Sequence, residues 1–175
     1  SLHNFNNSIN TGNWLLSMNQ LKFDIIIKNG RVMDGSGNTW YHADVGIKGS
    51  RITEINDLSN ATASRVINAK GMIVAPGFID IHSHSDYPVL IEPEVHSKIR
   101  QGVTTEVIGN CGSSAAPMNK ILSEYREKYD KSQLGEKFAF SCNSMKEYLD
   151  IIRVKGASFN IVPLTGHGTL RQNII

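Results

Sequence analysis

Residues 75–86 contain the feature that most constrains this chain, a short apolar run, APGFIDIHSHSD, that ends in two histidines one residue apart. In an extended strand, side chains two positions apart point to the same side. His82 and His84 therefore direct both imidazoles to one point, as a single metal ion requires, and Asp80 lies one step below them on the same face. Such a strand is typical of a (β/α)8 barrel, whose active sites lie at the C-terminal ends of its strands. By itself the pair is equally compatible with two surface histidines.

The composition excludes several classes of protein. The chain has 175 residues, of which 40% are hydrophobic and 19% charged, as in an ordinary globular protein. A formal net charge of +2 without a run of like charges argues against a nucleic-acid or membrane partner. No apolar run has the length of a membrane span. Two cysteines are too few for a disulfide scaffold, and free thiols agree with a cytoplasmic location.

The first part of the chain is predicted to form a tail and a small sheet. Residues 1–21 are rich in Asn and Ser and are interpreted as a tail or remnant, with Met18 as a natural start. Residues 22–74 contain short β-rich runs, with a hairpin predicted at Asn29-Gly30 and another at Gly49-Ser50. Ligand-type residues do not cluster in this segment, so we interpret it as a structural antiparallel sheet.

The histidine run is followed by a predicted helix over residues 93–101 and a strand over residues 103–108. The order strand, helix, strand is a βαβ unit and predicts parallel strands. Cys111 then lies at the same edge of the sheet as the histidines, where a thiolate completes a nitrogen–sulfur metal site. Instead of a metal ligand, Cys111 can be a small buried side chain. His96 lies inside the predicted helix, where a histidine is usually solvated or packed rather than bound to a metal.

Two more helices and a third strand follow. Helices are predicted over residues 117–128 and 144–154, the second with a capping box of Ser144 and Glu147. The polar stretch between them, residues 129–143, is interpreted as an active-site insertion. The strand over residues 159–164 contains a proline that predicts distorted pairing, and it leads to His167 at the same edge as the other histidines.

Three segments together resemble the amidohydrolase superfamily. Residues 75–86 are similar to its metal-binding signature. Residues 101–112, QGVTTEVIGNCG, and residues 166–171, GHGTLR, are similar to the D-aminoacylase (N-acyl-D-amino-acid deacylase) branch, which has a cysteine where many relatives have a carboxylated lysine. The resemblance covers residues 22–175.

The resemblance implies a fold and a domain organisation. The expected class is α/β: a tail at residues 1–21, an antiparallel β-sandwich segment at residues 22–74, and the first strands and helices of an incomplete metal-dependent-hydrolase (β/α)8 (TIM) barrel at residues 75–175. A closed barrel needs eight strands and about 250 residues. The open sheet is therefore expected to pair with a second copy or with the rest of its barrel, and the chain alone is expected to be inactive and not a stable monomer.

The resemblance also implies a reaction and a site. The reaction is zinc-dependent hydrolysis of an N-acyl-D-amino acid to a carboxylate and a D-amino acid. His82, His84 and Cys111 are the implied ligands of one or two zinc ions, and the general base is expected beyond Ile175. The residues expected near the ligands or the substrate are Asp80, Asp86, Asn110, His167 and Arg171.

Two other functions fit the same residues. The parent protein is, in one alternative, a relative on the same fold that acts on cyclic amides such as hydantoins. In the other, the chain is a non-catalytic interaction module that retains the motifs. For Asp80, a structural hydrogen bond unrelated to a metal is as compatible with the sequence as a bond to a ligating imidazole. For Arg171, a structural ion pair is at least as compatible as a contact with a substrate carboxylate.

Overall fold

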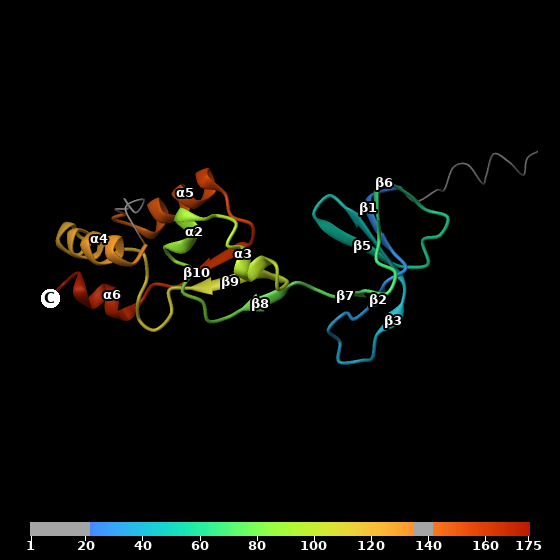
Figure 1. Ribbon diagram of the computed structural model, residues 1–175, viewed down its shortest axis with the longest axis horizontal. Coiled ribbons are helices and arrows are strands. Elements are labelled where there is room, and N and C mark those ends of the chain that lie inside the picture. Colours follow the sequence, from blue (N-terminus) through green and yellow to red (C-terminus); the bar gives the residue numbers. More distant parts are fainter. Residues whose placement is uncertain (1–21, 135–141) are drawn as a thin grey trace, which may run out of the picture. The chain divides into compact units, whose positions relative to one another are not determined.

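A computed structural model describes residues 22–134 and 142–175, so the predicted tail and residues 135–141 of the predicted insertion lie outside the described residues. The chain divides into two compact units, residues 1–76 and residues 77–175 (Figure 1). Within the described ranges, no helix combines the length and the apolar character needed to cross a bilayer.

The first unit contains two mixed sheets rather than the predicted antiparallel one. The larger sheet has the order β5-β4-β1-β6, formed by β1 (Lys22–Lys28), β4 (Asp44–Lys48), β5 (Arg51–Asn56) and β6 (Thr62–Asn68). The smaller has the order β3-β2-β7, formed by β2 (Arg31–Val32), β3 (Tyr41–His42) and β7 (Ile73–Val74). The antiparallel expectation is wrong because β6 and β7 return through connections long enough to pair parallel with β1 and β2.

The two predicted hairpins have opposite outcomes. β4 and β5 pair antiparallel around Gly49, as predicted. The hairpin at Asn29-Gly30 is wrong, because β1 and β2 belong to different sheets. Asn29 has the expected positive φ of 64°, but Gly30 lies so close to Val74 that a Cβ atom would come within 2.5 Å of its side chain. The glycine thus allows a close approach between segments and does not complete a two-residue turn.

The second unit contains a parallel sheet in the order β10-β9-β8, formed by β8 (Phe78–Asp80), β9 (Val103–Ile108) and β10 (Asn160–Pro163). β9 has the predicted bounds and lies in the centre of the described sheet. Pro163 pairs in regular register with Ile108, so the expected distortion is absent from the described β9–β10 pairing. A proline is tolerated there because β10 is an edge strand of this sheet.

The single helix predicted over residues 93–101 is wrong. The connection between β8 and β9 contains two short helices instead, α2 (Pro88–Ile91) and α3 (His96–Ile99). Val95, which is buried in the core and has a left-handed φ of 37°, separates them. A β-branched residue in this conformation interrupts the helical backbone, which explains why the helix begins at His96.

The described part of the unit also contains three longer helices: α4 (Lys120–Leu134), α5 (Met145–Lys155) and α6 (His167–Gln172). α4 extends through residues 129–134, which were expected in the insertion. Ser144 caps α5 as predicted, accepting a hydrogen bond from the Glu147 backbone N–H. The core lies between the sheet, α2 and α5 and includes Val89, Ile108 and Tyr148. Figure 1 shows α4 beside α6, and hydrogen bonds between Asn119 and Asn173 join the two segments.

Candidate metal centre

The two histidines lie on the histidine loop, residues 81–87, which connects β8 to α2. The predicted strand is too long, because β8 ends at Asp80. The Asp80 carboxylate accepts a hydrogen bond from the His82 backbone N–H at 3.1 Å, which turns the chain out of the strand. The Ser83 N–H still donates to the Val107 carbonyl at 3.0 Å, so the loop stays alongside β9. Both imidazoles are exposed, and their ring centres are 5.5 Å apart.

Cys111 lies in the tight turn that follows β9. It has a left-handed backbone with φ of 54°, between Gly109 and Gly112 at 82° and 74°. Asn110 joins this turn to the histidine loop, because its side-chain amide donates to the backbone carbonyls of Ser83 (3.2 Å) and Val107 (2.8 Å). The exposed thiol is thereby directed to the side of the sheet edge where the histidines lie.

The side chains of His82, His84 and Cys111 converge. Each offers one ligand atom, and the three atoms lie within 4.8 Å of one another. The His82 Nε2 and Cys111 Sγ atoms are 3.1 Å apart, at hydrogen-bond distance. Among the described residues this is the one group of three or more His, Cys, Asp or Glu side chains with such spacing. Two imidazoles and one thiolate around a common point are a donor set suited to a single soft or borderline ion.

Asp80 contacts the backbone of a histidine rather than an imidazole. Its second carboxylate oxygen accepts from the Lys98 ammonium group, which belongs to α3. The hydrogen bond to Lys98, followed by the one from the His82 N–H, lowers the pKa of Asp80 below its ordinary value. The carboxylate therefore stays ionised and anchors the start of the histidine loop. The sequence did not identify Lys98 as the partner of Asp80, because no local pattern marks this lysine.

Asp86 is buried at the end of the histidine loop and does not belong to the three-ligand group. Burial raises the pKa of its carboxyl group, while hydrogen bonds from the backbone of Gly109 and Ala115 act in the opposite direction. Its backbone carbonyl accepts a hydrogen bond from the Tyr148 hydroxyl at 2.8 Å. Asp86 thus joins the loop to the turn of Cys111 and to α5.

His167 and Arg171 lie on α6, which begins close to the cysteine turn. The Thr169 N–H donates to the Gly112 carbonyl at 3.0 Å, and a Cβ atom on Gly166 would come within 2.5 Å of the same oxygen. The glycines beside His167 thus permit the close backbone approach that the sequence indicated. His167 is exposed and outside the three-ligand group, and Arg171 lines a cleft of about 570 Å³ between α4 and α6.

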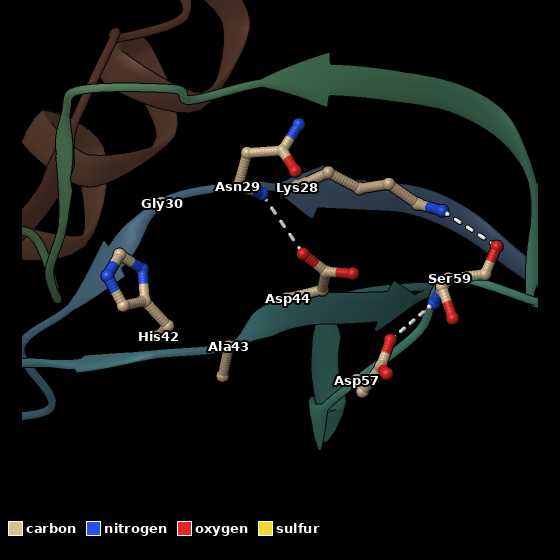
Figure 2. Close-up of a pocket in the computed structure, with 8 residues that line it drawn as sticks. All are labelled: Lys28, Asn29, Gly30, His42, Ala43, Asp44, Asp57 and Ser59. Carbon is tan, nitrogen blue, oxygen red and sulfur yellow. Dashed lines mark hydrogen bonds between the residues drawn. The ribbon is translucent and has the colours of Figure 1, made fainter.

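A further pocket, of about 520 Å³, lies in the first unit (Figure 2). Figure 2 shows that its polar side chains bond the surrounding turns: the Asp44 carboxylate accepts from the Asn29 N–H, and Asp57 accepts from the Ser59 N–H. Lys28 donates to the Ser59 carbonyl. These bonds stabilise the loops between the strands of the first unit.

Sequence reasoning missed two buried residues behind the histidines, Ser83 and Glu106. They form a hydrogen bond of 2.5 Å between the Ser83 hydroxyl and the Glu106 carboxylate. A signal was available for Glu106, because a single acid inside the β-rich run VTTEVI breaks its apolar pattern. A buried ionisable side chain in such a strand requires a partner.

Comparisons with known proteins match most of this chain. The amidohydrolase family profile matches residues 65–155. D-aminoacylase of Alcaligenes xylosoxydans xylosoxydans is 39% identical over 153 residues, which are 87% of this chain and 31% of the relative. N-acyl-D-glutamate deacylase of the same organism is 40% identical over 152 residues, 87% of this chain and 30% of the relative.

Solved structures give the same result. The N-acyl-D-glutamate deacylase of Bordetella bronchiseptica, crystallised with zinc and a phosphonate inhibitor, has a TM-score of 0.76 and 34% identity over 88% of this chain and 31% of its own. A D-aminoacylase studied for its binuclear metal centre has a TM-score of 0.77 and 38% identity over 87% of this chain and 31% of its own. The chain spans about 30% of the length of the curated relatives it matches. Because the family profile covers more than half of its residues, this chain belongs to the amidohydrolase family.

Proposed function

We propose that this chain carries the zinc-binding part of a hydrolase that cleaves the amide bond of N-acyl-D-amino acids to a carboxylate and a D-amino acid. The observation that carries the proposal is the convergence of two imidazoles and one thiol within 4.8 Å. The D-aminoacylase and the N-acyl-D-glutamate deacylase among the relatives support the substrate class. The zinc in a solved relative supports the choice of metal.

The donor set fits zinc. His82, His84 and Cys111 would hold the ion through two nitrogens and one sulfur, the ligand types that zinc favours. The His82 Nε2 and Cys111 Sγ atoms are 3.1 Å apart, so both can reach one ion. Ligation requires a thiolate and a neutral imidazole, so binding of a metal would release protons. When bound, zinc lowers the pKa of a coordinated water and polarises the amide carbonyl.

The other residues of the site orient the ligands. Asp80, held by Lys98, fixes the backbone of His82, and Asn110 fixes the histidine loop against the cysteine turn. His167 and Arg171 are proposed to border the substrate, with the Arg171 guanidinium available for a substrate carboxylate. α6 is bonded to the cysteine turn through Thr169, which supports this assignment.

We further propose that β8, β9 and β10 are the first three strands of a (β/α)8 barrel. Their parallel order and the metal-type residues after β8 and β9 support this architecture. In such a barrel, further ligands and the general base come from later strands. We therefore expect deacylase turnover only from a protein that combines these residues with the later strands.

Metal analysis tests the site directly. We expect zinc to copurify with the chain and to be lost from His82→Ala and from Cys111→Ser, since each removes one of three ligands. His96→Ala is the matched control, because His96 is an exposed histidine of the same unit that pairs with Glu94 outside the cluster. Unchanged zinc content in both ligand variants would contradict the proposed site.

A substrate panel tests the reaction. The complete reading frame, loaded with zinc, is assayed with N-acyl-D-amino acids, their L enantiomers and hydantoins. We expect hydrolysis of the D series and loss of it in Cys111→Ser. Hydrolysis restricted to the cyclic amides would favour the hydantoin alternative, and zinc binding without any turnover would favour a non-catalytic module.

A further inference from the structure

Glu106 is an acidic residue at a fully buried position of the second unit. It lies in β9, the central strand of the described sheet, and its side chain is fully buried. One carboxylate oxygen accepts the hydrogen bond from the Ser83 hydroxyl at 2.5 Å. The other oxygen has no hydrogen-bond partner among the described residues. Burial of a carboxylate is unfavourable unless polar contacts compensate, and here the hydrogen bond to Ser83 and the electrostatic interaction with the Lys98 ammonium group do so.

Ser83 lies between the two histidines and is buried, whereas both imidazoles are exposed. Its backbone N–H donates to Val107, its carbonyl accepts from the Asn110 amide, and its hydroxyl donates to Glu106. The hydroxyl is also 3.1 Å from that of Ser85. Every polar group of Ser83 therefore bonds the histidine loop to β9, to the turn that follows β9, or to itself.

This arrangement connects the two halves of the ligand set. His82 and His84 are the immediate neighbours of Ser83 on the loop, and Cys111 follows the strand that contains Glu106. The distance between loop and strand therefore decides how close the imidazoles come to the thiol, which is 3.1 Å for His82 Nε2. Because both imidazoles are exposed and Ser83 between them is buried, the buried side of the loop fixes where the imidazoles lie.

We propose that Glu106 is a positioning residue that acts through Ser83: its buried carboxylate holds the histidine loop at the separation from Cys111 that a shared ion needs. The inference rests on the proposed function, because it assumes that the three ligands bind a metal. Neither Ser83 nor Glu106 belongs to the three-ligand group. Outer partners of metal ligands typically change metal affinity by roughly 10- to 100-fold when they are removed.

Titration with Co²⁺ tests the inference. Cobalt occupies zinc-type sites, and a thiolate ligand gives it a charge-transfer absorption that reports the bond to Cys111. We expect Ser83→Ala and Glu106→Leu each to weaken Co²⁺ binding by roughly 10- to 100-fold and to reduce the thiolate band. Glu106→Gln keeps an oxygen that accepts from the Ser83 hydroxyl, so it should bind Co²⁺ much more tightly than Glu106→Leu.

A control separates positioning from general stability. Asn173→Ala removes hydrogen bonds to Asn119, Pro117 and Thr169 in the same unit, and none of these bonds reaches the histidine loop or β9. We expect it to lower the free energy of unfolding but to leave the Co²⁺ affinity and spectrum unchanged. All titrations are made at a temperature at which circular dichroism shows the variant folded.

The outcomes are distinct for the two proposals. If the unsubstituted chain gives no thiolate–cobalt band, the proposed metal site fails, and this inference fails with it. If the unsubstituted chain binds Co²⁺ and Ser83→Ala binds it with the same affinity and spectrum, the metal site stands and the positioning role of Glu106 is overturned.

Discussion

The two cysteines of this chain have contrasting surroundings. Cys111 is exposed, and its sulfur is 3.1 Å from the His82 Nε2 atom. Cys142 is buried against the core, and its thiol donates to the Ser144 carbonyl. Burial raises the pKa of the Cys142 thiol above its ordinary value, because the charged thiolate is poorly solvated there. Reactivity with a thiol reagent depends on both exposure and thiolate content.

We therefore expect thiol labelling at neutral pH in two separate phases, a fast one at Cys111 and a slow one at Cys142. Because the Cys142 pKa is raised, its thiolate fraction is lower at every pH, and the slow phase should accelerate only at pH values above those for an ordinary thiol. Zinc should suppress the fast phase, and Cys111→Ser should remove it. Equal labelling rates for both thiols would contradict this expectation.

The backbone around Gly109 leaves no space for a side chain. Its φ is 82°, and a Cβ atom would come within 2.2 Å of the Leu164 carbonyl oxygen. We expect Gly109→Ala to lower the free energy of unfolding by more than Gly156→Ala. Gly156 has a φ of 83° with open space around it, so its substitution costs only backbone strain of about 1–3 kcal/mol. Chemical denaturation measures the free energy of unfolding of both variants. Equal losses would show that the Leu164 carbonyl moves aside without cost.

At the scale of elements, α5 shows how a sequence pattern becomes structure. The Ser144 side chain accepts from the Glu147 N–H, and the Glu147 carboxylate accepts from the Asn143 N–H, one residue earlier than in the usual box. We expect Ser144→Ala to lower the free energy of unfolding by about 1 kcal/mol and Ser144→Gly by only a few tenths. Urea denaturation provides the measurement, and an unchanged midpoint for Ser144→Ala would contradict a stabilising cap.

The elements also show where prediction from sequence succeeds. β9 was predicted to its ends, because β-branched residues are followed by glycine, and the expected convergence of two histidines with Cys111 agrees with the spacing of their ligand atoms. The helix over residues 93–101 was wrong because Val95 is left-handed and buried in the core. The hairpin at Asn29-Gly30 was wrong because Gly30 packs closely against Val74, which is distant in the sequence. The hydrogen bonds of Lys98 and Ser83 likewise depend on tertiary packing, which leaves no local pattern.

At the scale of the whole molecule, the sheet of the second unit has apolar side chains in contact with solvent. Phe78 and Ile79 of β8 are 63% and 62% exposed, Ile81 of the adjoining histidine loop is 75% exposed, and β8 is an edge strand of the described sheet. Electrostatic repulsion between copies of the chain is weak, because the formal net charge is only +2. Exposed apolar edges of this kind favour association with another polypeptide.

We therefore expect the chain to self-associate as its concentration rises, and sedimentation velocity measures this. Ile79→Thr should reduce association, because it removes apolar surface from the strand while keeping a β-branched residue. Ile121→Thr is the control, since Ile121 is 79% exposed but lies on α4. A monodisperse monomer at every concentration would show that the expected association is wrong.

The central position of β9 has a consequence for hydrogen exchange. Its backbone is paired with β8 on one edge and β10 on the other, and its Glu106 and Ile108 side chains are fully buried. Amide protons of a strand paired on both edges reach solvent only when the sheet opens as a unit. In deuterated water, peptides from residues 103–108 should thus take up label last among those of the second unit, and the order of uptake measured by mass spectrometry should place β8 and β10 before β9.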